Sequence, residues 1–250
     1  MLCLPYAGGG VSVFHGWSDA LPAGLALWPV QLPGREDRIG DAPFSRIGPL
    51  VEALGDVVHA HVRQPFALFG HSMGALIAFE LARHLRRRFG VQPVRLFVSG
   101  YVAPHLPARS APVHDLPEDA FLDHVRRLNG TSEAVLANPE IRRLIVSVLR
   151  ADLALCETFA YTADEPLGCA ISAFGGLEDP EVRRADLLAW RMHTSRDFTL
   201  RMFAGDHFFL RAARRTLLEA MRADLASEVC SCTPGTSPTG AAHASDGSVR

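Results

Sequence analysis

The stretch that decides the fold is "FALFGHSMGALIAFELA", residues 66–82. An apolar run typical of a buried strand leads into Gly70-His71-Ser72-Met73-Gly74, and an apolar run typical of a helix follows. The pentapeptide matches G-x-S-x-G, the tight strand-to-helix turn that exposes a serine at its apex. Both flanking positions need glycine, because a Cβ would clash where the helix packs against the strand. We therefore predict Ser72 as a nucleophile; the alternative is a serine buried in an ordinary turn.

Composition and charge exclude several other classes of protein. The chain has 250 residues, of which 48% are hydrophobic and 21% charged, as in soluble proteins with one main domain. The formal net charge of −2 gives no reason to expect a nucleic acid or a membrane as partner. We find no signal peptide, no membrane span and no zinc spacing among the cysteines. We therefore expect a cytoplasmic protein.

Strand and helix patterns alternate along most of the chain. Strand patterns occupy residues 2–5, 27–32, 66–69, 94–98, 170–174 and 198–203, and helix patterns occupy 11–21, 47–62, 73–87, 181–190 and 208–227. This alternation predicts an α/β protein with a doubly wound, mostly parallel sheet.

One segment of the chain departs from the alternation. Residues 117–161 carry only helical signals, so we expect a helical lid inserted at about 110–165. Within it, Asn138-Pro139-Glu140 predicts a helix start, with an N-cap, a proline at the first position and an acid in the first turn. The folded domain is expected over residues 1–230. Residues 231–250 are polar and aperiodic, which predicts a disordered tail.

A serine nucleophile needs a base, and His207 is the best candidate. It follows the strand pattern 198–203 in the loop Ala204-Gly205-Asp206-His207. A loop after the last strand opens at the carboxyl edge of the sheet, where Ser72 is also expected. His193 is the rival.

The base needs an orienting acid, for which we predict Asp179. It lies in the loop after the strand pattern 170–174, and the expected chain order is serine, acid, histidine. Glu178 and Asp206 are the rivals. The alternative for Asp179 is an aspartate in a surface turn before Pro180.

The oxyanion formed during attack on a carbonyl needs two N–H donors. The residue after the nucleophile supplies one, hence Met73, and the loop after the first strand supplies the other. In that loop, Tyr6-Ala7-Gly8-Gly9-Gly10, we choose Ala7. The glycine run lacks the spacing of a phosphate-binding loop.

Taken together, these motifs resemble a known family, the type II thioesterases of polyketide and nonribosomal peptide synthesis. The resemblance spans about residues 2–227. It rests on Pro5 to Gly9, Leu32-Pro33-Gly34-Arg35, residues 70–74, Gly176 to Pro180, Trp190 with His193-Thr194, and Gly205 to Leu210. There are two departures: the chain begins later than family members do, without their first strands, and Tyr101-Val102 stands where an arginine pair is common.

The resemblance implies an α/β-hydrolase fold and the hydrolysis of acyl thioesters on the phosphopantetheine arm of acyl or peptidyl carrier proteins. The acyl groups would be short or aberrant, so the enzyme would edit stalled assembly lines. The triad would be Ser72, Asp179 and His207, with Ala7 and Met73 as the oxyanion hole. We expect a monomer with no cofactor or metal of its own. The alternatives are another esterase of this fold, a medium-chain fatty acyl thioesterase, or a non-catalytic binding module.

Two further sets of residues have open roles. Five apolar residues of the lid either shape an acyl pocket or only pack the lid: Phe121, Val125, Leu128, Val135 and Leu136. Three arginine clusters either dock an acidic carrier protein or are ordinary solvated surface: Arg86 to Arg88, Arg183-Arg184, and Arg211 with Arg214-Arg215.

Overall fold

A six-stranded parallel sheet forms the centre of the protein, as predicted. The computed structural model describes residues 1–21, 24–63, 65–128 and 137–231. The strands lie in the order β2-β1-β3-β4-β5-β6, and every neighbouring pair is parallel. Their bounds are β1 Leu2–Leu4, β2 Trp28–Pro29, β3 Ala67–His71, β4 Arg95–Ser99, β5 Ala170–Gly176 and β6 Phe198–Phe203.

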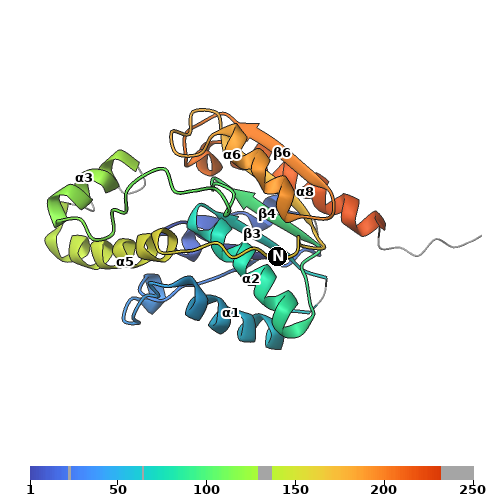
Figure 1. Ribbon diagram of the computed structural model, residues 1–250, viewed down its shortest axis with the longest axis horizontal. Coiled ribbons are helices and arrows are strands. Elements are labelled where there is room, and N and C mark those ends of the chain that lie inside the picture. Colours follow the sequence, from blue (N-terminus) through green and yellow to red (C-terminus); the bar gives the residue numbers. More distant parts are fainter. Residues whose placement is uncertain (22–23, 64, 129–136, 232–250) are drawn as a thin grey trace, which may run out of the picture.

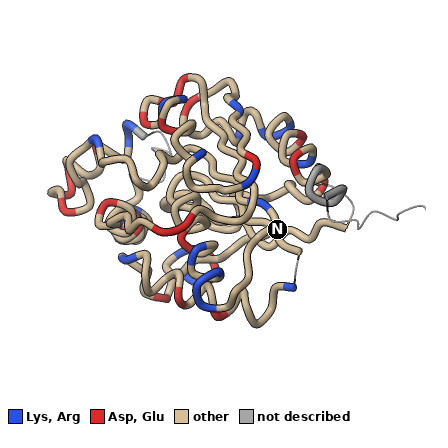
Figure 2. The backbone as a smooth tube through the Cα atoms, turned by 45° about the vertical axis from the view of Figure 1, so that its right-hand side comes forward, with Lys and Arg blue, Asp and Glu red and all other residues tan. Residues whose placement is uncertain are grey.

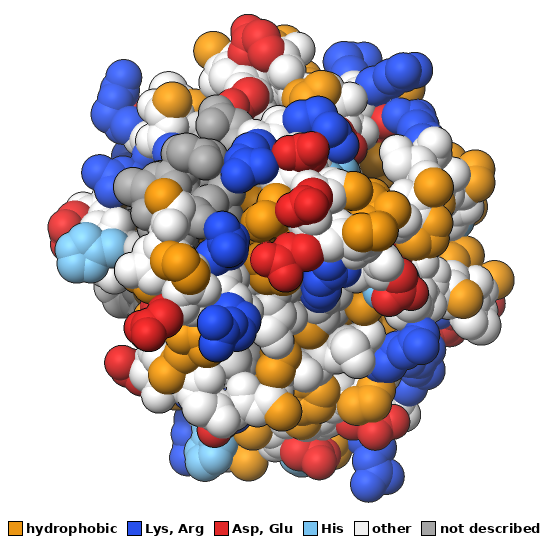
Figure 3. Space-filling model, turned by 90° about the vertical axis from the view of Figure 1, so that its left-hand side faces the viewer, with side chains coloured by type: hydrophobic (Ala, Val, Ile, Leu, Met, Phe, Trp, Pro, Cys, Tyr) orange, Lys and Arg blue, Asp and Glu red, His pale blue; other side chains and the backbone are white. Residues whose placement is uncertain are grey.

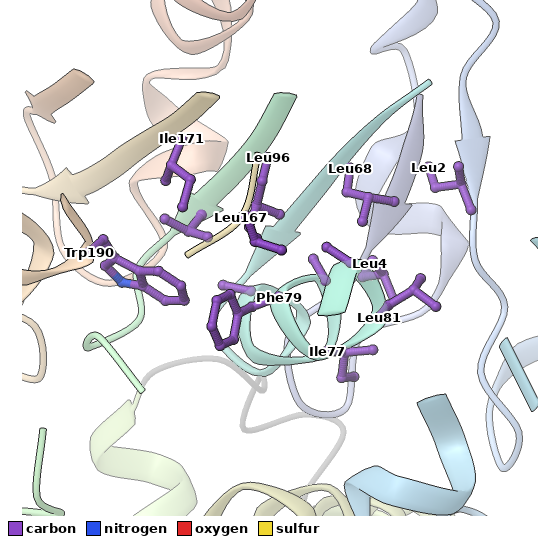
Figure 4. Packing of buried hydrophobic residues seen from close by; sticks show 14 of the residues in the cluster. Leu2, Leu4, Leu68, Ile77, Phe79, Leu81, Leu96, Leu167, Ile171 and Trp190 are labelled. Atoms are coloured by element: carbon purple, nitrogen blue, oxygen red, sulfur yellow. The ribbon is translucent and has the colours of Figure 1, made fainter. Parts of the chain in front are cut away.

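One face of the sheet packs against helices α1 (Ile47–His61) and α2 (Met73–Phe89). Successive side chains of a strand point to opposite faces, so every second strand residue enters this core. Figure 4 shows Leu68, Leu96 and Ile171 from neighbouring strands beside Phe79 of α2 and Trp190. Burial of the apolar residues of α2 in this core fixes the helix, and therefore the serine at its start, against the sheet.

The opposite face of the sheet carries an aromatic core. Phe69, Phe97 and Phe174 come from neighbouring strands and are fully buried there. Two helices near the carboxyl terminus, the short α7 (Phe209–Ala212) and the long α8 (Arg214–Ser231), cover this face. Helices on both faces define a doubly wound arrangement (Figure 1).

Between β4 and β5 the chain forms the predicted helical insertion, with α3 (Glu118–Leu128) and α5 (Pro139–Glu157). Figure 1 shows the insertion at the left, at the carboxyl ends of the strands. Helix α5 begins as predicted: the Asn138 side chain accepts hydrogen bonds from the N–H groups of Glu140 and Ile141. The insertion therefore lies at the sheet edge where Ser72 is expected.

The prediction of one helix over residues 11–21 is wrong. The segment forms two short 3₁₀ turns, Val11–Phe14 and Ser18–Ala20. Gly16 lies between them with φ of 73°, a left-handed conformation that interrupts a helix. The apolar spacing that suggested a helix here serves two separate turns.

Three other predicted elements are shorter or divided. The strand over 27–32 is reduced to β2 at the sheet edge, where the N–H groups of Trp28 and Val30 donate to the carbonyls of Met1 and Cys3. The helix over 181–190 becomes α6 (Arg184–Leu188) followed by a 3₁₀ turn, Ala189–His193. The helix over 208–227 is divided into α7 and α8.

Charged residues are spread over the outside of the molecule. In Figure 2, basic and acidic positions alternate along the peripheral helices and loops. Among the described helices, none is both long and apolar enough to cross a bilayer.

Candidate active site

Ser72 lies at a strained turn between β3 and α2. Its backbone has φ of 53° and ψ of −122°. Conformations of this kind cost about 1–3 kcal/mol and persist only where the surroundings impose them. Here the Ser72 N–H donates to the Ser99 carbonyl at 2.7 Å, and the Ala75 N–H donates to the Ser72 carbonyl at 2.8 Å. These bonds hold the serine at the apex of the turn.

Close backbone contacts explain both glycines of the pentapeptide. A Cβ on Gly70 would overlap the carbonyl group of Gly74, and one on Gly74 would overlap the carbonyl group of Leu4. The turn can therefore form only where both residues lack a side chain.

His207 and Asp179 meet Ser72 in one hydrogen-bonded chain. His207 follows β6 and Asp179 follows the neighbouring strand β5. His207 Nε2 lies 3.0 Å from Ser72 Oγ, and His207 Nδ1 lies 2.8 Å from Asp179 Oδ2. The Asp179 side chain is fully buried, and its other oxygen accepts the N–H groups of Glu181 and Val182. This arrangement can take a proton from the serine and stabilise the resulting imidazolium.

The rival residues occupy other places. The Glu178 carboxylate accepts the Gly205 N–H, and Asp206 Oδ1 accepts the Phe208 N–H at 2.8 Å. Both therefore shape the loop that carries His207. His193 is buried and bonds to His105 at 2.8 Å.

A second histidine, His71, lies beside His207. The two ring centroids are 5.2 Å apart, and His71 Nδ1 lies 2.8 Å from Ser99 Oγ. Burial, reinforced by the nearby His207, holds the pKa of His71 well below its usual value. His71 is therefore neutral at pH 7 and places no second positive charge beside an imidazolium at His207. Gly100 leaves room for this ring, since a Cβ there would lie 2.7 Å from His71 Cε1.

The two predicted oxyanion donors lie at neighbouring strand ends. Met73 is the first residue of α2, where the N–H groups of the first turn have no partner within the helix. Ala7 lies in the loop after β1, the strand that pairs with β3. In that loop the Gly9 N–H donates to the Tyr6 carbonyl at 2.9 Å and closes a tight turn around Ala7.

The insertion packs on the Ala7 loop through its apolar residues. Phe121 and Val125 are buried in a cluster with Leu149 of α5, and Ala7 packs against this cluster. Phe121 and Val125 therefore stabilise the packing of the insertion, and the cluster they form contacts the loop of Ala7. The Leu128 side chain, Val135 and Leu136 lie outside the described part of the chain.

Arginines of two of the three predicted clusters have partners within the molecule. Arg86 and Arg87 pair with Asp164. Arg211 stacks on Phe208 beside His207, with its guanidinium carbon 4.7 Å from the ring centroid. Figure 3 shows the face on which the insertion lies, where basic, acidic and hydrophobic side chains are interspersed.

The sequence-based reasoning missed a buried ion pair between Arg35 and Asp152 of α5. The signal was present: Asp152 follows Leu149 and precedes Leu155 at helical spacing, on the buried stripe of α5. An acid on such a stripe indicates a buried partner.

Comparison with known proteins identifies the family. The family model described as "Thioesterase domain" matches residues 1–225. The chain belongs to this family.

The chain is similar to proteins of antibiotic biosynthesis. It is 43% identical over 221 residues to the gramicidin S biosynthesis protein GrsT of Aneurinibacillus migulanus, covering 88% of this chain and 86% of GrsT. The thioesterase RedJ from the prodiginine pathway of Streptomyces coelicolor is 41% identical, with a TM-score of 0.84 over 89% of each chain. The type II thioesterase BorB from the borrelidin cluster is 38% identical, with a TM-score of 0.81 over 90% of this chain and 91% of BorB.

These matches confirm the predicted resemblance to type II thioesterases and the α/β-hydrolase fold. The protein is a hydrolase that acts on thioesters.

Proposed function

We propose that this thioesterase removes short or aberrant acyl groups from the phosphopantetheine arm of acyl or peptidyl carrier proteins, through a triad of Ser72, His207 and Asp179. The observation that carries the proposal is the hydrogen-bonded chain from Ser72 through His207 to buried Asp179. The likeness to GrsT and BorB supports a carrier-bound substrate.

In the first step, Ser72 Oγ attacks the thioester carbonyl and His207 Nε2 takes its proton. Asp179 keeps the imidazole oriented and stabilises its charged form. The N–H groups of Ala7 and Met73 donate to the oxyanion. The C–S bond then breaks, and the pantetheine thiol leaves with the proton from His207.

In the second step, water attacks the acyl group on Ser72. His207 takes a proton from the water and returns it to Ser72 Oγ as the acid is released. The helical insertion, which contacts the loop of Ala7, would serve as the lid of this site. No bound metal or cofactor takes part in these steps.

Replacing the nucleophile tests the mechanism. In Ser72→Ala, hydrolysis of an acyl carrier protein thioester should fall by about a million-fold, because a triad without its nucleophile retains little activity. Steady-state hydrolysis and labelling of Ser72 by a fluorophosphonate probe measure this. A Ser72→Ala variant of near-wild-type activity would refute the mechanism.

A substrate panel tests the proposed substrate. Carrier proteins loaded with acetyl, propionyl, butyryl and longer chains should be hydrolysed with higher kcat/KM than the matching acyl-CoA and p-nitrophenyl esters. Faster turnover of p-nitrophenyl esters would favour another esterase of this fold. A preference for medium chains would favour a fatty acyl thioesterase.

A further inference from the structure

A buried ion pair joins the helical insertion to the loop of Ala7. Asp152 of α5 is 2% exposed and Arg35 is 5% exposed. Two parallel hydrogen bonds of 2.8 Å link the guanidinium to the two carboxylate oxygens. A buried ion pair often adds no more stability than apolar residues of the same volume, because both charges lose their hydration. Stability alone is therefore a weak reason for this pair.

Both members of the pair also hold the backbone of the glycine loop. Asp152 Oδ2 accepts the Gly8 N–H at 2.7 Å, and Arg35 Nη1 donates to the Gly9 carbonyl at 3.2 Å. The neighbouring Glu36 holds the end of the same loop, because its carboxylate accepts hydrogen bonds from the N–H groups of Val11 and Ser12. The segment from Arg35 to Glu36 and helix α5 thus hold the loop by its polar backbone groups.

Two separate bonds hold the two peptide groups that flank the α-carbon of Ala7, and Asp152 makes one of them. The Gly9 N–H donates to the Tyr6 carbonyl and so fixes the direction of that carbonyl. Because the peptide between Tyr6 and Ala7 is planar and trans, the Ala7 N–H must point the opposite way. On the other side, Asp152 holds the Gly8 N–H. Gly8 has φ of 76°, as the third residue of a type II turn requires.

Loss of the carboxylate would free the central peptide of this turn. While Asp152 is ionised, a rotated peptide would turn the Ala7 carbonyl oxygen toward a negative charge. An asparagine at this position keeps one acceptor oxygen but lacks the negative charge, and its NH2 group cannot accept from Arg35, so both the rotation and the bond to Arg35 are less strongly controlled.

We propose that Asp152 is a positioning residue, which with Arg35 holds the Tyr6–Gly9 turn so that the Ala7 N–H faces the oxyanion. This inference rests on the proposed function, in which Ala7 is an oxyanion donor. It also makes the helical insertion part of the catalytic apparatus, because α5 carries the carboxylate.

The test compares Asp152→Asn with wild type, using an acyl carrier substrate and an alkyl trifluoromethyl ketone as inhibitor. Ser72 Oγ adds to the ketone carbon, His207 takes the hydroxyl proton, and the ketone oxygen becomes an anion in the oxyanion hole. Removal of a whole oxyanion donor costs about 10²–10³ in kcat. We expect Asp152→Asn to lower kcat by about 10- to 100-fold and to weaken the inhibitor by a similar factor, with KM within about twofold.

The control is Asp224→Asn, in a buried carboxylate that bonds to Arg201 and lies outside the site. It should lower the melting temperature and leave kcat of the folded enzyme unchanged. Folded Asp152→Asn with kcat and inhibitor affinity within threefold of wild type would overturn the inference, as would an equal loss of kcat in Asp224→Asn. Should Asp152→Asn not fold, Arg35→Lys is judged by the same criteria.

The same inhibitor separates this inference from the proposed function. The adduct with the wild-type enzyme should give a ¹⁹F NMR signal that is absent with Ser72→Ala. This result would establish Ser72 as the nucleophile, independently of the role of Asp152. Absence of the adduct from wild type would refute the proposed function itself.

Discussion

At the scale of single residues, the close backbone contact between Gly70 and Gly74 decides which residue types the turn around Ser72 accepts. A Cβ on Gly70 would overlap backbone atoms, which cannot move aside as the end of a side chain can. We expect Gly70→Ala to lower the free energy of unfolding by at least about 3 kcal/mol. Urea unfolding followed by circular dichroism measures this.

Gly48→Ala is the matched control for the contact of Gly70. Gly48 lies in α1, where an added Cβ has no neighbour within 4 Å. This variant should lose much less stability than Gly70→Ala, because its added Cβ crowds only the following Pro49 and no distant backbone. A Gly70→Ala protein as stable as Gly48→Ala would contradict the proposed clash.

Residues with a local signature could be predicted, and those without one could not. Ser72 lies in a recognisable turn, and His207 follows a clear strand in a loop at the sheet edge. Arg35 and Asp152 are 117 positions apart. Only folding brings them together, so no local pattern pairs them. Sequence order likewise did not separate Asp179 from Glu178, whereas the geometry does: Glu178 bonds to the Gly205 N–H, and Asp179 to His207.

At the scale of elements, the start of α5 matters for the insertion. Asn138 Oδ1 accepts the N–H groups of Glu140 and Ile141 at 3.0 and 3.2 Å. Loss of such a cap costs about 1 kcal/mol. We expect Asn138→Ala to lower the melting temperature by about 2–4 °C and to speed hydrogen exchange in the first turn of α5.

Asn138→Asp, which keeps the acceptor oxygen, should behave as wild type. Equal exchange rates in Asn138→Ala and wild type would show that the cap does not stabilise α5.

Elements with a strong period or a clear boundary were predicted, and segments set by distant contacts were not. The strand over 198–203 and the start of α5 agree with the structure. The segment 11–21 has a helix-like period, yet Gly16 and bonds from Glu36 to Val11 and Ser12 impose turns. The Glu36 partner lies beyond any local window of sequence, so the period alone was misleading.

At the scale of the whole molecule, the parallel sheet gathers the site. Parallel strands all end at one edge, so the loops after β1, β3, β5 and β6 meet there. Ala7, Ser72, Asp179 and His207 each follow one of these strands. This is why chain order and topology sufficed to predict that these candidate residues share one edge, although the insertion's contact with Ala7 was not predicted.

Buried histidines make the stability of the whole molecule depend on pH. His193 is 4% exposed and faces His105, Arg83 and Tyr161. Burial, with the charges of His105 and Arg83, lowers the pKa of His193 to about 4. The unfolded chain binds this proton near pH 6.5, so the unfolded state holds more protons between pH 6.5 and about 4. The stabilisation is therefore complete above pH 6.5 and is lost as the pH falls toward 4.

Urea unfolding at pH 7, 6, 5 and 4.5 tests this dependence in wild type, His193→Gln and His61→Gln. One extra proton in the unfolded state changes the free energy of unfolding by at most about 1.4 kcal/mol per pH unit. His193→Gln should reduce the slope between pH 6.5 and 4 by up to that amount, because glutamine keeps a polar group toward His105 but does not titrate. His61 is exposed at the end of α1, so His61→Gln should keep the wild-type slope. Equal slopes in wild type and His193→Gln would mean that His193 titrates alike in the folded and unfolded states. The loss of stability in acid would then come from other groups whose pKa burial lowers, His71 and His105 among them.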